Sequence, residues 1–132
     1  MALATTVSKV IHLSFAAFWT GSVLFAVVVH PTLDAASVRT VLGRLVTVSR
    51  ASSVVLLLTG AHLAGVLYGG ALFSGRGYYV LAMVVLWLAL TALVEVAAAR
   101  VDSAPTRSAR ALQTAAVVAV FLLLDAGVLL GA

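Results

Sequence analysis

The stretch YYVLAMVVLWLALTALVEVAAA, Tyr78–Ala99, contains a single charged residue, Glu95. A helix rises about 1.5 Å per residue, so this stretch is long enough to cross a hydrocarbon core of about 30 Å. Its apolar residues are continuous rather than alternating, and a helix satisfies its own backbone groups in lipid. The stretch therefore predicts a membrane-spanning helix, and this prediction decides the fold class.

Three more stretches of the same kind lie at residues 7–29, 49–69 and 109–132. The whole chain is 64% hydrophobic and 9% charged, with a mean hydropathy of +1.22, which is typical of membrane proteins. The connections between the stretches are short, so neighbouring helices are expected to pack antiparallel. We predict an all-α, up-and-down four-helix bundle that forms one transmembrane domain over residues 1–132, with no separate soluble catalytic domain.

The distribution of Lys and Arg predicts the orientation of the bundle. Six arginines lie in or beside the first and third connections, whereas the opposite side carries one lysine and one arginine. The positive-inside rule then places these connections in the cytoplasm and both termini outside, in a multi-pass protein of the cell membrane. The net charge of +4 is explained by a basic rim that faces anionic lipid headgroups, not by a nucleic-acid surface. The six arginines are Arg39, Arg44, Arg50, Arg100, Arg107 and Arg110; the opposite side has Lys9 and Arg76.

The connections carry local signals of helix ends. Residues 30–50 offer Asp34 or Ser37 as an N-cap before apolar residues at helical spacing, which predicts either an interfacial helix or an extension of the second span. In the third connection Pro105 breaks the helix, and Thr106 or Ser108 is a candidate cap for the last span. Glu95, near the cytoplasmic side, is expected to pair with an arginine there, and Arg50 is a candidate.

Besides Glu95, three ionisable side chains inside the spans require an explanation, because charged groups are costly in lipid. His12 lies about 7 to 8 Å inside the first span, and His62 lies about 10 Å from the outer end of the second. Asp125 falls in the same layer of the fourth span. Similar depth on adjacent antiparallel helices predicts that the two imidazoles lie near each other.

Two interpretations fit this layer. The first is a haem b site near the outer face, with His12 and His62 as axial ligands and Gly65 and Gly69 leaving room for the porphyrin. Lys9 and Arg76 would then pair with the haem propionates, Trp19 would line the pocket, and Asp125 would orient a ligating histidine. The second interpretation is helix packing, because Ala61, Gly65 and Gly69 form a series of small residues that lets membrane helices approach closely.

A bare metal site is a further alternative for the same residues. His12, His62 and Asp125 offer two imidazoles and one carboxylate, a donor set that suits copper(II), zinc or iron(II). The chain has no cysteine, which excludes disulfides, thiolate ligands and iron–sulfur clusters. His30, at the inner end of the first span, is interpreted as an interfacial residue.

The first two spans carry a family resemblance. The stretches IHLSFAAFWTGSVLFAVVVHP (Ile11–Pro31) and RLVTVSRASSVVLLLTG (Arg44–Gly60) resemble the CopD-like four-helix membrane proteins, which are related in pattern to HemJ-type protoporphyrinogen oxidases. The shared features are an early histidine, His12, a W-x-G step from Trp19, an inner proline, and a TG pair that ends at Gly60. Where many members have a lysine early in the third span, this chain has Met83.

The resemblance implies an integral four-helix protein with either haem b and porphyrin redox chemistry or a role in copper handling. The leading functional prediction is thus a haem b protein that transfers electrons or handles haem, with a redox partner protein or membrane complex. The alternatives are a CopD-type copper or divalent-metal transport or resistance protein, a HemJ-like porphyrinogen oxidase, and a structural membrane subunit. Homo-oligomerisation through the face from Ala61 to Gly69 is left open.

Overall fold

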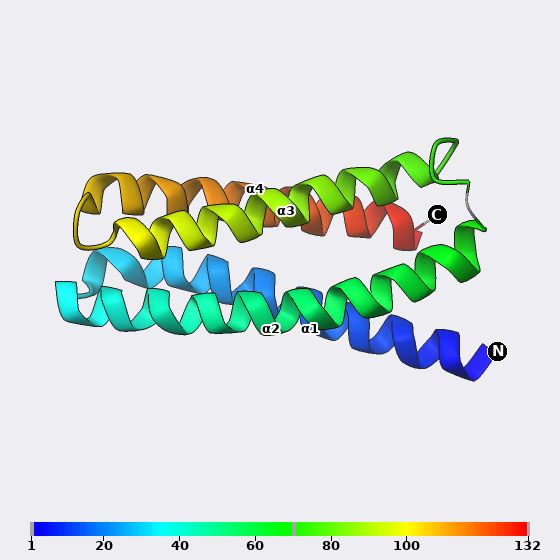
Figure 1. Ribbon diagram of the computed structural model, residues 1–132, viewed down its shortest axis with the longest axis horizontal. Helices are drawn as coiled ribbons and strands as arrows, with labels where there is room; N and C mark the ends of the chain where they lie inside the picture. Colours follow the sequence, from blue (N-terminus) through cyan, green and yellow to red (C-terminus); the bar gives the residue numbers. More distant parts are fainter. Residues whose placement is uncertain (1, 70, 132) are drawn as a thin grey trace.

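Four long helices in an up-and-down arrangement make up the computed structural model, which describes residues 2–69 and 71–131 (Figure 1). All four are long and apolar enough to cross a membrane, so the predicted fold class is confirmed. A short 3-10 turn joins the first two helices. The elements are α1 (Ala2–Val29), η1 (His30–Thr32), α2 (Ala35–Tyr68), α3 (Gly77–Arg100) and α4 (Pro105–Gly131).

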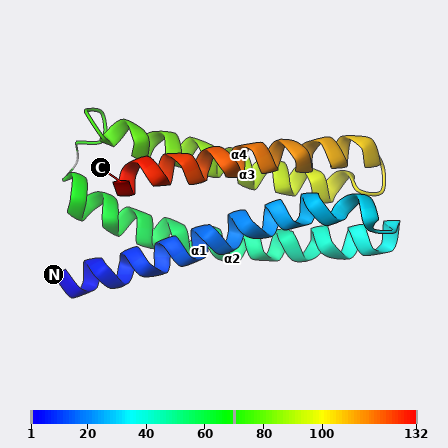
Figure 2. The same ribbon diagram turned by 180° about the vertical axis from the view of Figure 1, so that it is seen from behind.

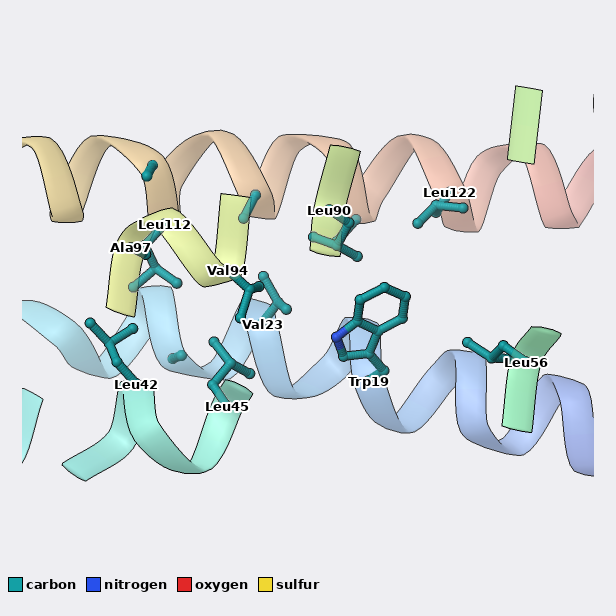
Figure 3. Close-up of a cluster of buried hydrophobic side chains, with 14 residues drawn as sticks. Trp19, Val23, Leu42, Leu45, Leu56, Leu90, Val94, Ala97, Leu112 and Leu122 are labelled. Carbon is teal, nitrogen blue, oxygen red and sulfur yellow. The ribbon is translucent and has the colours of Figure 1, made fainter. Parts of the chain in front are cut away.

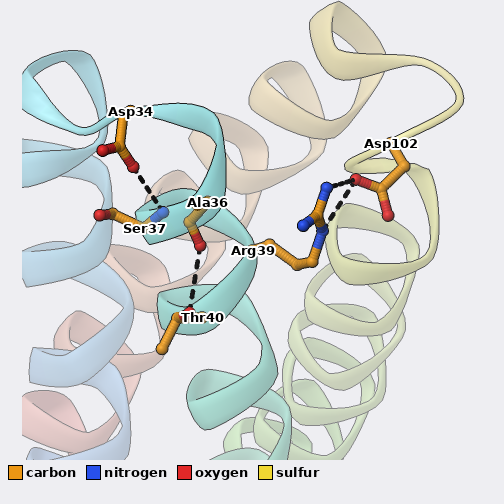
Figure 4. A network of polar contacts seen from close by, with 6 residues as sticks. All are labelled: Asp34, Ala36, Ser37, Arg39, Thr40 and Asp102. Atoms are coloured by element: carbon orange, nitrogen blue, oxygen red, sulfur yellow. Dashed lines mark hydrogen bonds and ion pairs between the residues drawn. The ribbon is translucent and has the colours of Figure 1, made fainter.

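The second helix begins well before the predicted span. It starts at Ala35, so the arginine-bearing first connection is an extension of α2 and not a separate interfacial helix. Asp34 is the N-cap, and its side chain accepts a hydrogen bond of 2.7 Å from the backbone N–H of Ser37 (Figure 4). This hydrogen bond stabilises the carboxylate and lowers the pKa of Asp34.

The cap predicted for the last span is wrong. The fourth helix begins at Pro105, whose fixed φ and missing N–H suit the first position of a helix. Ser108 lies one turn inside α4, where its buried hydroxyl donates a hydrogen bond of 2.6 Å to the carbonyl of Ala97 on α3. Its side chain therefore ties two helices together rather than capping one.

The bundle has two unequal ends. At one end, called the closed end here, η1 and the turn between α3 and α4 bring the helices together; the other, called the open end, holds Ala2, Gly131 and the connection between α2 and α3 (Figure 1). In both ribbon views α1 diverges from α4 towards the open end (Figures 1 and 2). Each helix packs against two neighbours, so that α1 and α3 occupy diagonal corners.

The buried apolar core extends from the closed end to a little beyond the middle of the bundle, where it ends at Leu56 and Leu122. Trp19, Val23, Leu90 and Val94 are almost completely buried there (Figure 3). Many large apolar side chains are instead exposed on the outside of the bundle, as with Phe25 at 67%. A bilayer removes this outer surface from water, which supports the membrane context.

Two ion pairs connect α2 to α3 and to the turn that follows it. Arg50 donates to both carboxylate oxygens of Glu95, at 2.8 and 3.1 Å, so the predicted pairing is confirmed. Near the closed end, Arg39 donates twice to one oxygen of Asp102, at 3.0 and 2.6 Å (Figure 4). Both pairs lie on the outer surface of the bundle, where they help to fix the α2 register against its neighbour.

Candidate functional site

An apolar cavity of about 400 Å³ lies between the helices on the side of the core that faces the open end. All four helices and Leu72 of the α2–α3 connection contribute to its walls. Three core residues line it where it meets the core: Trp19, Leu56 and Leu122. Its size falls within the range of small-molecule and cofactor sites, which are mostly apolar with a few polar groups in fixed positions.

His12 is one of those polar groups, and its orientation is set by Thr59. The imidazole lines the cavity, and its Nδ1 atom lies 2.8 Å from the Thr59 hydroxyl oxygen on α2. That hydroxyl donates its own proton to the backbone carbonyl of Val55, at 2.7 Å, so it is left to accept a hydrogen bond from His12. The contact therefore favours the tautomer protonated on Nδ1.

This tautomer leaves the Nε2 atom of His12 with a lone pair. A neutral imidazole whose Nδ1–H is held by a neighbouring acceptor is the usual form of a metal-ligating histidine. No hydrogen bond to Nε2 is formed by the residues of 2–69 and 71–131. The geometry thus presents an oriented imidazole nitrogen on a mostly apolar wall, whose other polar side chains include Lys9, Thr20 and Tyr68.

Gly60 provides the space in which the ring of His12 lies. A Cβ atom added to Gly60 would be 3.1 Å from Cε1 and 3.7 Å from Nδ1 of the imidazole. The first of these distances is tighter than an ordinary van der Waals contact, so a side chain here would push the ring. Thr59 and Gly60 together therefore position the imidazole from one turn of α2.

The structure does not bring His62 into the cavity. Its side chain is exposed and absent from the residues that line the cavity. At about 100° per residue, the lining residues Gly60 and Ala64 lie about 100° and 140° around the helix from Thr59, whereas His62 lies about 60° from Thr59 in the opposite direction. The predicted depth of His62 does not fix its rotation about the helix axis, and this rotation places His62 on the outer surface of α2.

The other predicted ligand-binding residues divide between the cavity and the surface. Lys9 and Trp19 line the cavity. Gly65 and Gly69 are exposed and do not line it, and Arg76 is exposed in the connection before α3. Of the small residues in the wall, Ala61 was predicted from the sequence only as part of a helix-packing face, and Gly60 was noted only in the TG pair. The small residues that make room in the wall are Ala16, Gly60, Ala61, Ala64 and Ala126.

Asp125 is partly buried on α4 and stands apart from the cavity lining. Its Oδ2 atom is buried and makes no hydrogen bond to the described part of the chain. Within residues 2–69 and 71–131, no group of three His, Cys, Asp or Glu side chains could hold a metal ion. His12, His62 and Asp125 are therefore not assembled into the predicted three-ligand site.

Two further polar features of the bundle were missed from the sequence. Trp87 lines the cavity from α3, and its indole N–H donates a hydrogen bond of 3.1 Å to Ser53 on α2. Ser53 also lies 3.5 Å from the hydroxyl of Thr91. The spacing of Trp87 and Thr91 by one helical turn could have indicated a polar seam between α2 and α3.

His30 lies far from this site, in a second cavity of about 320 Å³ at the closed end that Asp102 also lines.

Comparison of the chain with protein-family models, with curated proteins and with solved structures finds no match in any of the three.

Proposed function

We propose that this chain is a haem b-binding membrane protein that transfers electrons or handles haem, with His12 as an axial ligand. The observation that carries the proposal is the oriented imidazole of His12, with Nε2 free, on the wall of an apolar cavity inside a membrane bundle. Haem b, when bound, supplies an iron that exchanges one electron and takes nitrogen or sulfur ligands along its axis.

The residues around the cavity fit this group. The walls are almost entirely aliphatic or aromatic, as a porphyrin ring requires, and Ala61 and Ala64 keep α2 from filling the space. Lys9 lines the cavity about one helical turn towards the open end from His12, where an ammonium group can pair with a propionate. The proposed orientation puts the open end outside and the arginine-bearing closed end in the cytoplasm.

The test of this proposal is the absorption spectrum of the full-length protein. We expect protein purified in mild detergent, with haem added during expression or afterwards, to show a Soret band and to retain about one haem per chain. Metal analysis of the same sample distinguishes haem iron from bound copper or zinc. Protein that remains without a Soret band after haem supplementation would contradict the proposal.

A Gly60→Ala substitution tests whether the position of the imidazole matters. The new methyl group would lie 3.1 Å from Cε1 of His12, so we expect the ring to shift and haem affinity to fall by about 10-fold or more. Gly65→Ala is the matched control on the same helix, because no atom lies within 4 Å of the added Cβ. Haem titration of both variants measures the difference, and equal affinities would count against a ligand role for His12.

A further inference from the structure

We infer that Met83 is the second axial ligand of the haem, on the opposite side of the cavity from His12; this inference rests on the proposed function. His12 lies on α1 and Met83 on α3, and both line the cavity. These two helices occupy diagonal corners of the bundle, since each packs against α2 and α4. A haem between these two helices would therefore have the His12 imidazole on one side and the Met83 thioether on the other.

The register of the helices places the two side chains in the same layer. Ser53 on α2 contacts both Trp87 and Thr91, so it lies level with residue 89 of α3. Six residues towards the open end, α2 reaches Thr59, and the same rise along antiparallel α3 reaches Met83. Because Thr59 bonds to His12, the imidazole and Met83 lie at the same depth in the bundle.

Lys9 and Tyr68 also line the cavity with donor atoms, but neither faces His12 from across it. Lys9 shares α1 with His12, and Tyr68 lies nine residues, about 13 Å, beyond Thr59 towards the open end. Met83 is the donor that lies on α3 at the depth of the imidazole.

His62, the partner expected from the sequence, is exposed outside the cavity. The Trp87 indole is a donor that is already bonded to Ser53, and an indole N–H offers no lone pair to iron. A thioether paired with an imidazole is an established haem ligand set, and it raises the reduction potential relative to two imidazoles.

The experiment compares spectra of the full-length, haem-loaded protein with those of four variants. In wild-type protein we expect six-coordinate low-spin haem, with the weak far-red charge-transfer band of a methionine–iron bond in the ferric state. Met83→Leu keeps the volume and removes the thioether, so we expect loss of that band, conversion to high-spin haem and a lower midpoint potential. Met83→His is expected to restore low-spin haem without the far-red band.

Two control variants complete the set. Val85→Leu alters an exposed residue of α3 that does not line the cavity, and His62→Ala removes the alternative imidazole. Both variants are expected to retain the wild-type spectrum. A low-spin spectrum that survives Met83→Leu and is lost in His62→Ala would overturn the inference while leaving haem binding intact. A wild-type protein without any Soret band would instead overturn the proposed function on which the inference rests.

Discussion

Replacing His12 with alanine is expected to weaken haem binding at least about 100-fold, which corresponds to about 2.7 kcal/mol. The substitution removes the nitrogen donor that Thr59 orients towards the cavity, and no other imidazole of the described residues lines that cavity. Loss of a partner that only orients a ligand typically costs 10- to 100-fold in affinity, so loss of the ligand itself lies at or beyond that upper limit. Haem titration followed at the Soret band measures the effect.

Thr59→Val separates the orientation of the imidazole from its presence. Valine removes the hydroxyl that accepts from Nδ1, so we expect an intermediate loss of about 10-fold. The matched control is Thr47→Val, because the Thr47 hydroxyl donates only to its own helix, to the carbonyl of Gly43.

If the His12→Ala variant retained wild-type haem affinity, the iron would have to be held elsewhere, and the cavity would not be the haem site.

Replacing Trp19 with alanine is expected to produce the largest loss of stability, about 3 to 5 kcal/mol. Trp19 is 1% exposed and lies where the buried core meets the cavity, with Leu90 and Val23 nearby in the cluster (Figure 3). Removing the indole would join the cavity to a new void in the core, and the neighbouring side chains would lose their packing partners. Equilibrium unfolding in detergent, at a fixed detergent concentration, measures the change.

The neighbouring residue supplies the control for this substitution. Phe18 is 58% exposed on the outside of α1, so Phe18→Ala removes an aromatic ring of similar size from the outer surface. We expect it to change the free energy of unfolding by about 0.5 kcal/mol or less. Similar losses in the two variants would show that Trp19 does not anchor the core.

Hydropathy was sufficient to predict the helices, because every span in lipid must satisfy its own backbone hydrogen bonds and an apolar helix does so. The prediction for Glu95 and Arg50 also held, since a charge near the end of a span has few partners within reach. The start of α2 was harder, because its first turns extend beyond the apolar stretch and are capped by Asp34, which accepts from the backbone N–H of Ser37. Hydropathy carries no information about that part of the helix.

The candidate site was only partly predictable. His12 was singled out from the cost of an imidazole in lipid, and the structure places it on the wall of a cavity. His62 was paired with it by depth, but depth leaves the rotation of a helix about its axis undetermined. That rotation is set by side-chain contacts such as those of Thr59 with His12 and of Ser53 with Trp87. Met83 was noted only as a departure from a family pattern, since a methionine in an apolar span has no cost that marks it.

The buried core ends a little beyond the middle of the bundle, so the two ends of the bundle are expected to differ in how often they open locally. The buried apolar residues nearest the open end are Trp19 on α1, Leu56 on α2, Leu90 on α3 and Leu122 on α4. Beyond these limits, towards the open end, the helices have fewer buried contacts to hold them, and α1 and α4 diverge. Such segments exchange their amide hydrogens through local fluctuations, whereas the closed half exchanges mainly through global unfolding. A ligand in the cavity would complete the missing part of the core and slow exchange selectively in the open half.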